Sequence, residues 1–246
     1  MKKMIKKIAS LAFTFVATVS LAVPTFAEDT KAEVPTEENP MIVDKEAGTI
    51  SIWAYVNGKY LETSTRHAVV FDEGNFGGKS VYGTTANQND FYEALMEIGA
   101  EPGNNMTVDN ATETYVEGDI LDIKVTWEGA EKEYDLGETI IDSNGKEFEF
   151  HFGGNQETAK EKHTGCITCL DSCPVGLISN SAYTYGAVEK RSEVEFFGNV
   201  DILPEEGTPV IITYSVKKAD EKEDKEESKE ESKEETKEET KEETKK

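Results

Sequence analysis

Three cysteines, Cys166, Cys169 and Cys173, lie within eight residues of one another, and Pro174 follows the last of them. Their spacing is C-x2-C-x3-C-P. Thiolate sulfur binds zinc, copper(I) and iron–sulfur clusters, and two neighbouring thiols can also form a disulfide. Cysteines that only fill a core have no reason to crowd in this way. We therefore expect the three sulfur atoms to converge on one site, on a single bend of the chain.

An iron–sulfur centre is the first interpretation of this run. Bacterial ferredoxins carry C-x2-C-x2-C-x3-C-P, and the chain reproduces the last three cysteines and the proline. His163 stands where the first cysteine would be. A 4Fe–4S cluster held by Cys166, Cys169, Cys173 and His163 is therefore conceivable.

A single soft metal ion is the second interpretation, because three cysteines and one histidine suit tetrahedral Zn²⁺ and three thiolates suit Cu⁺. Disulfide chemistry is the third, and an odd number of cysteines leaves one thiol free after one bridge. Cys166 and Cys169 have the spacing of thiol–disulfide exchange motifs, although no thioredoxin-like βαβ pattern surrounds them. The sequence leaves all three interpretations open.

The other chemistry-bearing residues point to structural roles. His67 opens an apolar run and His151 lies on the polar face of an expected strand, so we expect a structural or solvated role for each. Residues 74–80 resemble a phosphate loop with one residue too few, which favours a loop between strands. No G-x-S-x-G, HExxH or EF-hand motif is present, so the sequence identifies no catalytic residue.

The net charge and the two ends of the chain indicate where the protein acts and which partners it does not bind. Fifty acidic residues against 26 basic ones give a net charge of −24, which makes binding to nucleic acid or to an anionic membrane surface improbable. Residues 1–27 carry four early lysines, an apolar run and a small-residue end at Ala27, the pattern of a secretory signal peptide. We expect cleavage after Ala27, a secreted or extracytoplasmic product and no membrane span after cleavage.

The remaining chain predicts one domain. Residues 28–40 contain Pro35 and Pro40 and are expected to form a linker. Residues 217–246 consist almost wholly of Lys, Glu, Ser and Thr, so they cannot bury enough apolar surface to offset the entropy of ordering and are expected to be disordered. Residues 41–216 are left as a single domain.

Alternation of apolar and polar residues predicts a mainly β fold, at the margin of α+β. It recurs at residues 50–56, 121–127, 147–152 and 210–216, which favours an antiparallel sheet or sandwich. Asn144-Gly145 between apolar stretches predicts a hairpin. Asp90 and Glu93 have capping-box spacing and predict one well-defined helix near 90–98, and a second short helix is expected near 156–162.

The sequence resembles the YdjY domain family, known mostly from bacterial exported proteins. The resemblance covers nearly all of residues 41–216, and its most specific element is the Gly-Ala-x-Pro-Gly turn after the expected helix. The segments that carry it are residues 42–45, 49–52, 90–95, 98–104, 172–176 and 207–210. The family is sometimes labelled ferredoxin-like because of its cysteines. The resemblance implies a domain identity and export, and no activity.

Three hypotheses follow from these observations. The first is a secreted metal-binding or iron–sulfur protein, with electron transfer or another redox-linked role and a redox or cell-envelope protein as its partner. The alternative is a non-catalytic extracellular interaction module with a structural disulfide and a free thiol. A thiol–disulfide oxidoreductase is the third, and the acidic neighbourhood disfavours it because it would raise the pKa of a thiol.

Overall fold

The computed structural model of the protein describes residues 33–218. The expected signal peptide and almost all of the expected disordered tail lie outside the described residues. Residues 33–40, in the expected linker, carry no helix or strand.

Twelve strands and four short helical segments are present in the described residues. The strands are β1 (Met41–Asp44), β2 (Thr49–Val56), β3 (His67–Phe71), β4 (Tyr82–Thr84), β5 (Leu121–Thr126), β6 (Tyr134–Asp135), β7 (Ile140–Asp142), β8 (Phe150–Phe152), β9 (Cys166–Cys169), β10 (Ile178–Asn180), β11 (Phe196–Gly198) and β12 (Pro209–Val216). The helical segments are α1 (Lys59–Glu62), α2 (Gln88–Glu97), the 3₁₀ turn η1 (Leu136–Thr139) and α3 (Gln156–Glu161).

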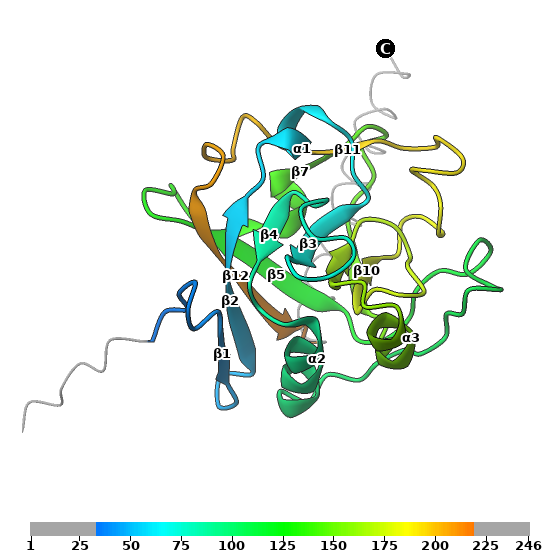
Figure 1. Ribbon diagram of the computed structural model, residues 1–246, viewed down its shortest axis with the longest axis horizontal. Coiled ribbons are helices and arrows are strands. Elements are labelled where there is room, and N and C mark those ends of the chain that lie inside the picture. Colours follow the sequence, from blue (N-terminus) through cyan, green and yellow to red (C-terminus); the bar gives the residue numbers. More distant parts are fainter. Residues whose placement is uncertain (1–32, 219–246) are drawn as a thin grey trace, which may run out of the picture. The chain divides into compact units, whose positions relative to one another are not determined.

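Most of the strands belong to one sheet, in the order β6-β5-β12-β2-β4-β3-β9-β10-β8, with β1 added beside β2 (Figure 1). Strands β11 and β7 form a separate pair. The expected mainly β class is confirmed. Most neighbours run antiparallel, but β3 with β4 and β9 with β10 are parallel, so the sheet is mixed.

The alternating strands lie next to one another and explain the core. In β2, Ile50, Ile52, Ala54 and Val56 are buried while the residues between them are partly exposed, as the period of two predicts. Cross-strand partners such as Ile52 and Ile212 bring these buried positions into register. Each strand therefore adds a row of apolar side chains to the same face.

The sheet curls so that β8, at one end of the strand order, approaches the start of β5, which is one strand from the other end. Ile120, just before β5, forms an antiparallel bridge with His151 in β8, and the amide of Phe152 donates to the carbonyl of Asp119 at 2.8 Å. The buried apolar side chains fill the space inside this curl. The ring of Phe91 in α2 packs edge-on against the ring of Tyr214 in β12, with the ring centres 4.8 Å apart.

Helix α2 forms where the sequence predicted it, but its cap differs. The helix begins at Gln88, and the side chain of Asn87 accepts from the amide of Asn89 at 2.8 Å. The expected capping residue, Asp90, lies instead inside the first turn, where a carboxylate favours the positive end of the helix dipole. The second expected helix is present as α3, beside α2 (Figure 1).

The predicted hairpin at Asn144-Gly145 is wrong, although the turn exists. Gly145 has a left-handed φ of 68°, and its amide donates to the carbonyl of Asp142 at 3.0 Å. The flanking strands nevertheless pair elsewhere, β7 with β11 and β8 with β10. The turn reverses the chain, but each flanking strand pairs with a strand from later in the sequence.

A search of residues 33–218 for a membrane-crossing helix finds none with the length and apolar character that a bilayer requires.

Candidate functional site

The cysteine run starts inside the sheet. Cys166 and Cys169 are the two ends of β9, which lies between β3 and β10, and all four residues of that strand are buried. Cys173 follows in the segment after the strand and is also buried. The expectation that one bend carries all three cysteines is therefore wrong, because two of them are strand residues.

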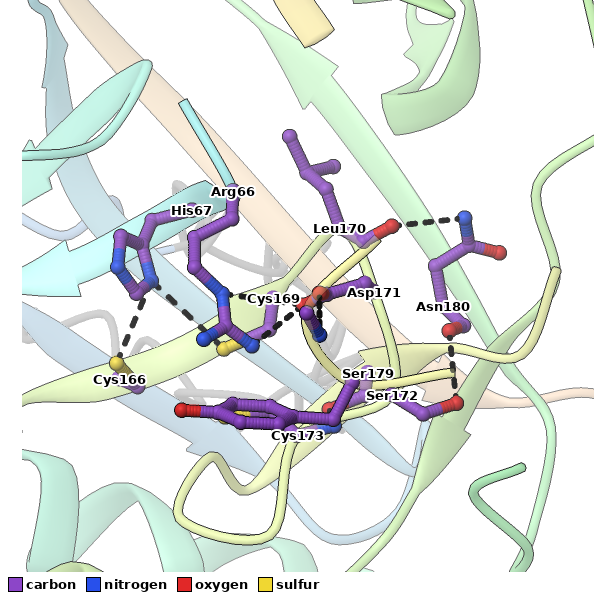
Figure 2. Close-up of polar contacts among 12 residues, drawn as sticks. Arg66, His67, Cys166, Cys169, Leu170, Asp171, Ser172, Cys173, Ser179 and Asn180 are labelled. Carbon is purple, nitrogen blue, oxygen red and sulfur yellow. Dashed lines mark hydrogen bonds and ion pairs between the residues drawn. The ribbon is translucent and has the colours of Figure 1, made fainter. Parts of the chain in front are cut away.

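His67, the first residue of β3, lies opposite this strand. It pairs with Cys169, and Val70 pairs with Cys166. Residues three apart on a regular strand point to opposite faces, but the register shifts twice along this pair of strands. As a result Nδ1 of His67 lies 3.5 Å from Sγ of Cys166 and 3.8 Å from Sγ of Cys169 (Figure 2).

These three side chains form a compact group of metal-ligand type. The donor atoms of His67, Cys166 and Cys169 all lie within 4.8 Å of one another, and all three residues are buried. Cys173 adjoins the group, because its side chain packs in the same buried cluster as Cys166 and Cys169. The three thiols are free.

The structure does not bring His163, the fourth ligand expected from the sequence, into this group. Its ring is exposed, and Nε2 contacts the carbonyl of Glu73 at 3.0 Å. His151 is occupied elsewhere, between the carbonyl of Gly118 and the carboxylate of Glu149.

The histidine at the sulfur atoms is thus His67, for which the sequence favoured a structural or solvated role. One sequence feature could have identified it. The run His-Ala-Val-Val-Phe lacks polar alternation, as strands buried on both faces do. A histidine at its start must then find a partner inside the protein.

The surroundings keep the imidazole of His67 neutral and the thiols of Cys169 and Cys173 protonated. Burial, and then the charges of Arg66 and Lys79, lowers the pKa of His67 to about 3. The hydrogen bond with Cys166 is the main cause that raises the pKa of Cys169, and the hydrogen bond with Cys169 does the same for the pKa of Cys173. A metal ion would bind the imidazole directly and would displace protons from the thiols.

A buried ion pair lies beside the sulfur atoms. Arg66 donates to Oδ1 of Asp171 through Nε at 3.1 Å and through Nη2 at 2.5 Å (Figure 2). The other oxygen of Asp171 accepts from the amide of Gly186 at 2.9 Å, and the guanidinium lies 4.4 Å from the centre of the Tyr185 ring. The positive charge of Arg66 favours thiolate at both Cys169 and Cys173.

Two amide side chains hold the backbone around the cysteines. Gln88 of α2 accepts from the amide of Gly165 at 2.9 Å and donates to the carbonyl of Cys166 at 2.8 Å. Asn155 donates to the carbonyls of Cys173 and Gly176, each at 3.1 Å. The chain that carries the thiols is therefore fixed from both sides.

Two cavities approach the site on either side of Phe76, in the loop that joins β3 to β4. One of about 400 Å³ is lined by Phe76, Val175 and Tyr185, which also pack against the cysteines. The other, of about 170 Å³, reaches Arg66 and His67. The ring of Phe76 lines both cavities and lies 5.1 Å from that of His67, measured between ring centres.

Comparison with known proteins gives a family for the chain. The family model of the YdjY domain matches residues 41–215. The "Uncharacterized protein YdjY" of Escherichia coli (strain K12) is 50% identical over 177 residues, which cover 72% of this chain and 79% of that protein. No solved structure gives a significant match. The chain belongs to the YdjY domain family.

Proposed function

We propose that this protein is an exported metal-binding protein that holds one soft metal ion, Zn²⁺, between β3 and β9. Cys166, Cys169 and His67 supply three ligands and Cys173 supplies the fourth. Imidazole nitrogen and thiolate sulfur in a set of four are the ligands that zinc takes in tetrahedral protein sites.

The observation that carries this proposal is the separation of the donor atoms. Zn–S bonds of about 2.3 Å and Zn–N bonds of about 2.0–2.1 Å at a tetrahedral angle place nitrogen and sulfur roughly 3.6 Å apart. The observed separations between Nδ1 and the two sulfur atoms are 3.5 and 3.8 Å. Both sulfur atoms are therefore already at the distance from the histidine nitrogen that ligands of one shared ion have.

Charge favours a divalent ion over Cu⁺. Three thiolates and a neutral imidazole leave one net negative charge around Zn²⁺ and two around Cu⁺. Uncompensated charge is costly in a buried site. Arg66 acts on the thiols, but it is already paired with Asp171, so it does not fully offset a second negative charge.

The same geometry disfavours the iron–sulfur interpretation. A 4Fe–4S cluster binds each cysteine through a different iron atom, which spreads the ligands further apart than a single ion does. The donor atoms of this group lie within 4.8 Å of one another, and His163 is held at Glu73. A ferredoxin-like ligand set of three cysteines and His163 would require a rearrangement of this segment.

Elemental analysis of the mature chain tests the proposal. The chain beginning at Glu28 should be reduced under anaerobic conditions, incubated with Zn²⁺, freed of excess metal and assayed for metal and for reactive thiols. We expect one zinc per chain and protection of all three thiols from alkylation. Absence of bound zinc, or an iron and sulfide content with visible absorption after anaerobic preparation, would contradict it.

Two histidine variants form a matched pair. His67 is close to the cysteines in space, and His163, the control, is close to them in sequence. The His67→Gln change should weaken zinc binding by about 10- to 100-fold or more, the loss seen even for residues that only support ligands. The His163→Gln change should leave the affinity unchanged. Equal losses in both variants would count against His67 as the ligand.

One observation favours a second candidate, a structural disulfide between Cys169 and Cys173. Both cysteines are free and lie in the same small buried cluster, and an exported protein meets an oxidising environment. Alkylation and intact mass of protein isolated without reductant separate the two candidates. One bridge and one free thiol would support the disulfide, and three thiols released only by a chelator would support the metal.

We also propose that the chain leaves the cytoplasm, on the basis of the basic start, apolar run and small-residue end of residues 1–27. Cell fractionation followed by N-terminal sequencing should find a product that begins at Glu28 outside the cytoplasm. A full-length product retained in the cytoplasm would contradict this.

A further inference from the structure

A small cavity lies directly behind the proposed zinc ligand His67. It encloses about 170 Å³, room for a molecule of a few non-hydrogen atoms, and it is bounded by three charged side chains, two buried rings and several small groups. Its lining residues are Tyr60, Ser64, Thr65, Arg66, His67, Phe76, Lys79, Val188 and Glu189.

Three buried side chains that line this cavity carry unpartnered polar groups. His67 is 4% exposed and contacts the sulfur atoms through Nδ1, while its Nε2 has no hydrogen-bond partner among the described residues. Arg66, 6% exposed, uses Nε and Nη2 on Asp171, and Nη1 has no acceptor within residues 33–218. The hydroxyl of Tyr60, 5% exposed, is likewise unpaired in that part of the chain.

These three groups reach open space rather than being sealed in the protein. In the described residues, the only polar side-chain atoms that are both fully enclosed and unpartnered are Oη of Tyr82 and Oδ1 of Asn89. Nε2 of His67, Nη1 of Arg66 and Oη of Tyr60 are therefore accessible, and the cavity is the space that their residues share. Nη1 of Arg66 and Oη of Tyr60 are donors that lack an acceptor, and Nε2 of His67 is a donor in the tautomer whose Nδ1 accepts from the thiols.

The charge around the cavity favours an anion as the missing acceptor. Arg66 and Lys79 both act on His67 electrostatically, and Nζ of Lys79 lies 5.2 Å from the centre of the Phe76 ring in the cavity wall. Glu189 is the one acidic side chain in the lining, and it is exposed. In a chain with a net charge of −24, a cavity with two cations and one anion is a local exception.

We propose that this cavity binds a small oxyanion, whose oxygen atoms accept from Nε2–H of His67 and Nη1–H of Arg66. A metal-binding histidine almost always donates its second ring N–H to an acceptor, and no protein acceptor among the described residues fills this role. The anion would complete that contact and would bias the ring toward binding through Nδ1. The inference deepens the proposed zinc site, but its donors are present in the metal-free chain as well.

The test follows the ring nitrogens of His67 in ¹⁵N-labelled mature protein by two-bond ¹H–¹⁵N correlation spectra. Sodium acetate and inorganic phosphate are titrated separately at constant ionic strength with chloride as the balancing ion. We expect a saturable shift at Nε2 of His67 and none at His163. The two arms distinguish a carboxylate from a phosphate ligand, and a shift in either one supports the proposal.

Surface variants test the electrostatic part without touching the zinc ligands. Lys79→Met should weaken the binding of the effective anion by about two- to fivefold, as expected for one exposed charge, whereas Lys160→Met, outside the cavity, should leave it unchanged. Glu189→Gln should strengthen binding, because it removes the opposing charge. Equal effects of Lys79→Met and Lys160→Met would show only a general dependence on net charge and would overturn the proposal.

The titration is run on the reduced metal-free chain and again after zinc addition. A saturable shift in the metal-free chain together with no bound zinc would retain the anion site and reject the metal site. Each anion is titrated up to about 50 millimolar, on the order of the weakest specific binding worth assigning. Bound zinc together with no saturable shift at His67 in either form would retain the metal site and reject the anion site.

Discussion

At the scale of single residues, the site depends on side chains whose pKa values differ from those in water. His67 would titrate near neutral pH in solution, but burial lowers its pKa to about 3, and the pKa of the Cys169 thiol beside it is raised. Each group satisfies the other through contacts from Nδ1 to the sulfur atoms. An incoming metal ion would replace these contacts without a large change in the positions of the donors.

Gly176 is required by the packing of the sulfur atoms. A β-carbon at this position would lie 2.8 Å from Sγ of Cys169 and close to the β-carbons of the other two cysteines. We predict that Gly176→Ala destabilises the chain by about 1–3 kcal/mol, the usual cost of overpacking a core, and weakens zinc binding. Urea denaturation and a competitive zinc titration measure the two effects, and a variant that matches the parent in both would refute the prediction.

The buried pair of Arg66 and Asp171 should respond more strongly to the loss of one partner than of both. We predict that Asp171→Leu destabilises the fold by about 3–5 kcal/mol, because it leaves a buried guanidinium uncompensated. The double variant Arg66→Met with Asp171→Leu should recover most of that loss. Urea denaturation of the parent, both single variants and the double variant gives the coupling energy. Additive effects would show that the two residues act independently.

At the scale of elements, alternation in the sequence identifies the strands with one exposed face, whereas a strand buried on both faces, such as β3, is visible only as an apolar run. β2, β5 and β12 alternate because each has one side in the core, so their period is visible in the sequence. β3 and β9 are buried throughout and have no such period. The pairing of β3 with β9 joins residues about a hundred positions apart, and nothing local specifies it. The cysteines are noticeable in the sequence because their spacing is local, whereas the approach of His67 to them depends on this long-range pairing.

The N-terminus of α2 is fastened to β9 by Gln88. Its buried side chain is hydrogen-bonded both to the amide of Gly165 and to the carbonyl of Cys166. We predict that Gln88→Ala leaves these groups unsatisfied, costs about 1–3 kcal/mol and speeds hydrogen exchange at the amide of Gly165. Gln156→Ala is the control, because Gln156 makes one exposed contact, with Glu93, and its loss should stay within about 0.5 kcal/mol. Unchanged exchange at Gly165 in the Gln88 variant would contradict this.

At the scale of the whole molecule, protonation of the site is linked to folding. The pKa of His67 is about 3 in the folded chain, against 6.5 for an unperturbed histidine. Folding therefore favours the neutral ring. This contribution is fully present above pH 6.5, and it is lost progressively as the pH falls from 6.5 toward 3. Because each unit of pKa shift corresponds to about 1.4 kcal/mol, the effect should be large enough to measure.

We predict that the metal-free, reduced chain loses stability between pH 7.5 and pH 4.5 and that His67→Gln reduces this loss. The difference in free energy of unfolding between the parent and the His67→Gln variant should become smaller as the pH falls. Urea denaturation midpoints at several pH values measure it. The His163→Gln variant serves as the control and should follow the parent. A His67→Gln profile parallel to that of the parent would mean that another group causes the loss.

The position of β12 has a consequence for how the protein is made. It is the last strand along the chain, yet it lies in the middle of the sheet, where it pairs with β2 on one side and β5 on the other. A nascent chain that emerges N-terminus first presents β2 and β5 with no neighbour between them until residue 216 has appeared. Assembly of the centre of the sheet must therefore wait until β12 has been synthesised, and until then one edge of β2 and one edge of β5 remain open to any other polypeptide that can pair with them.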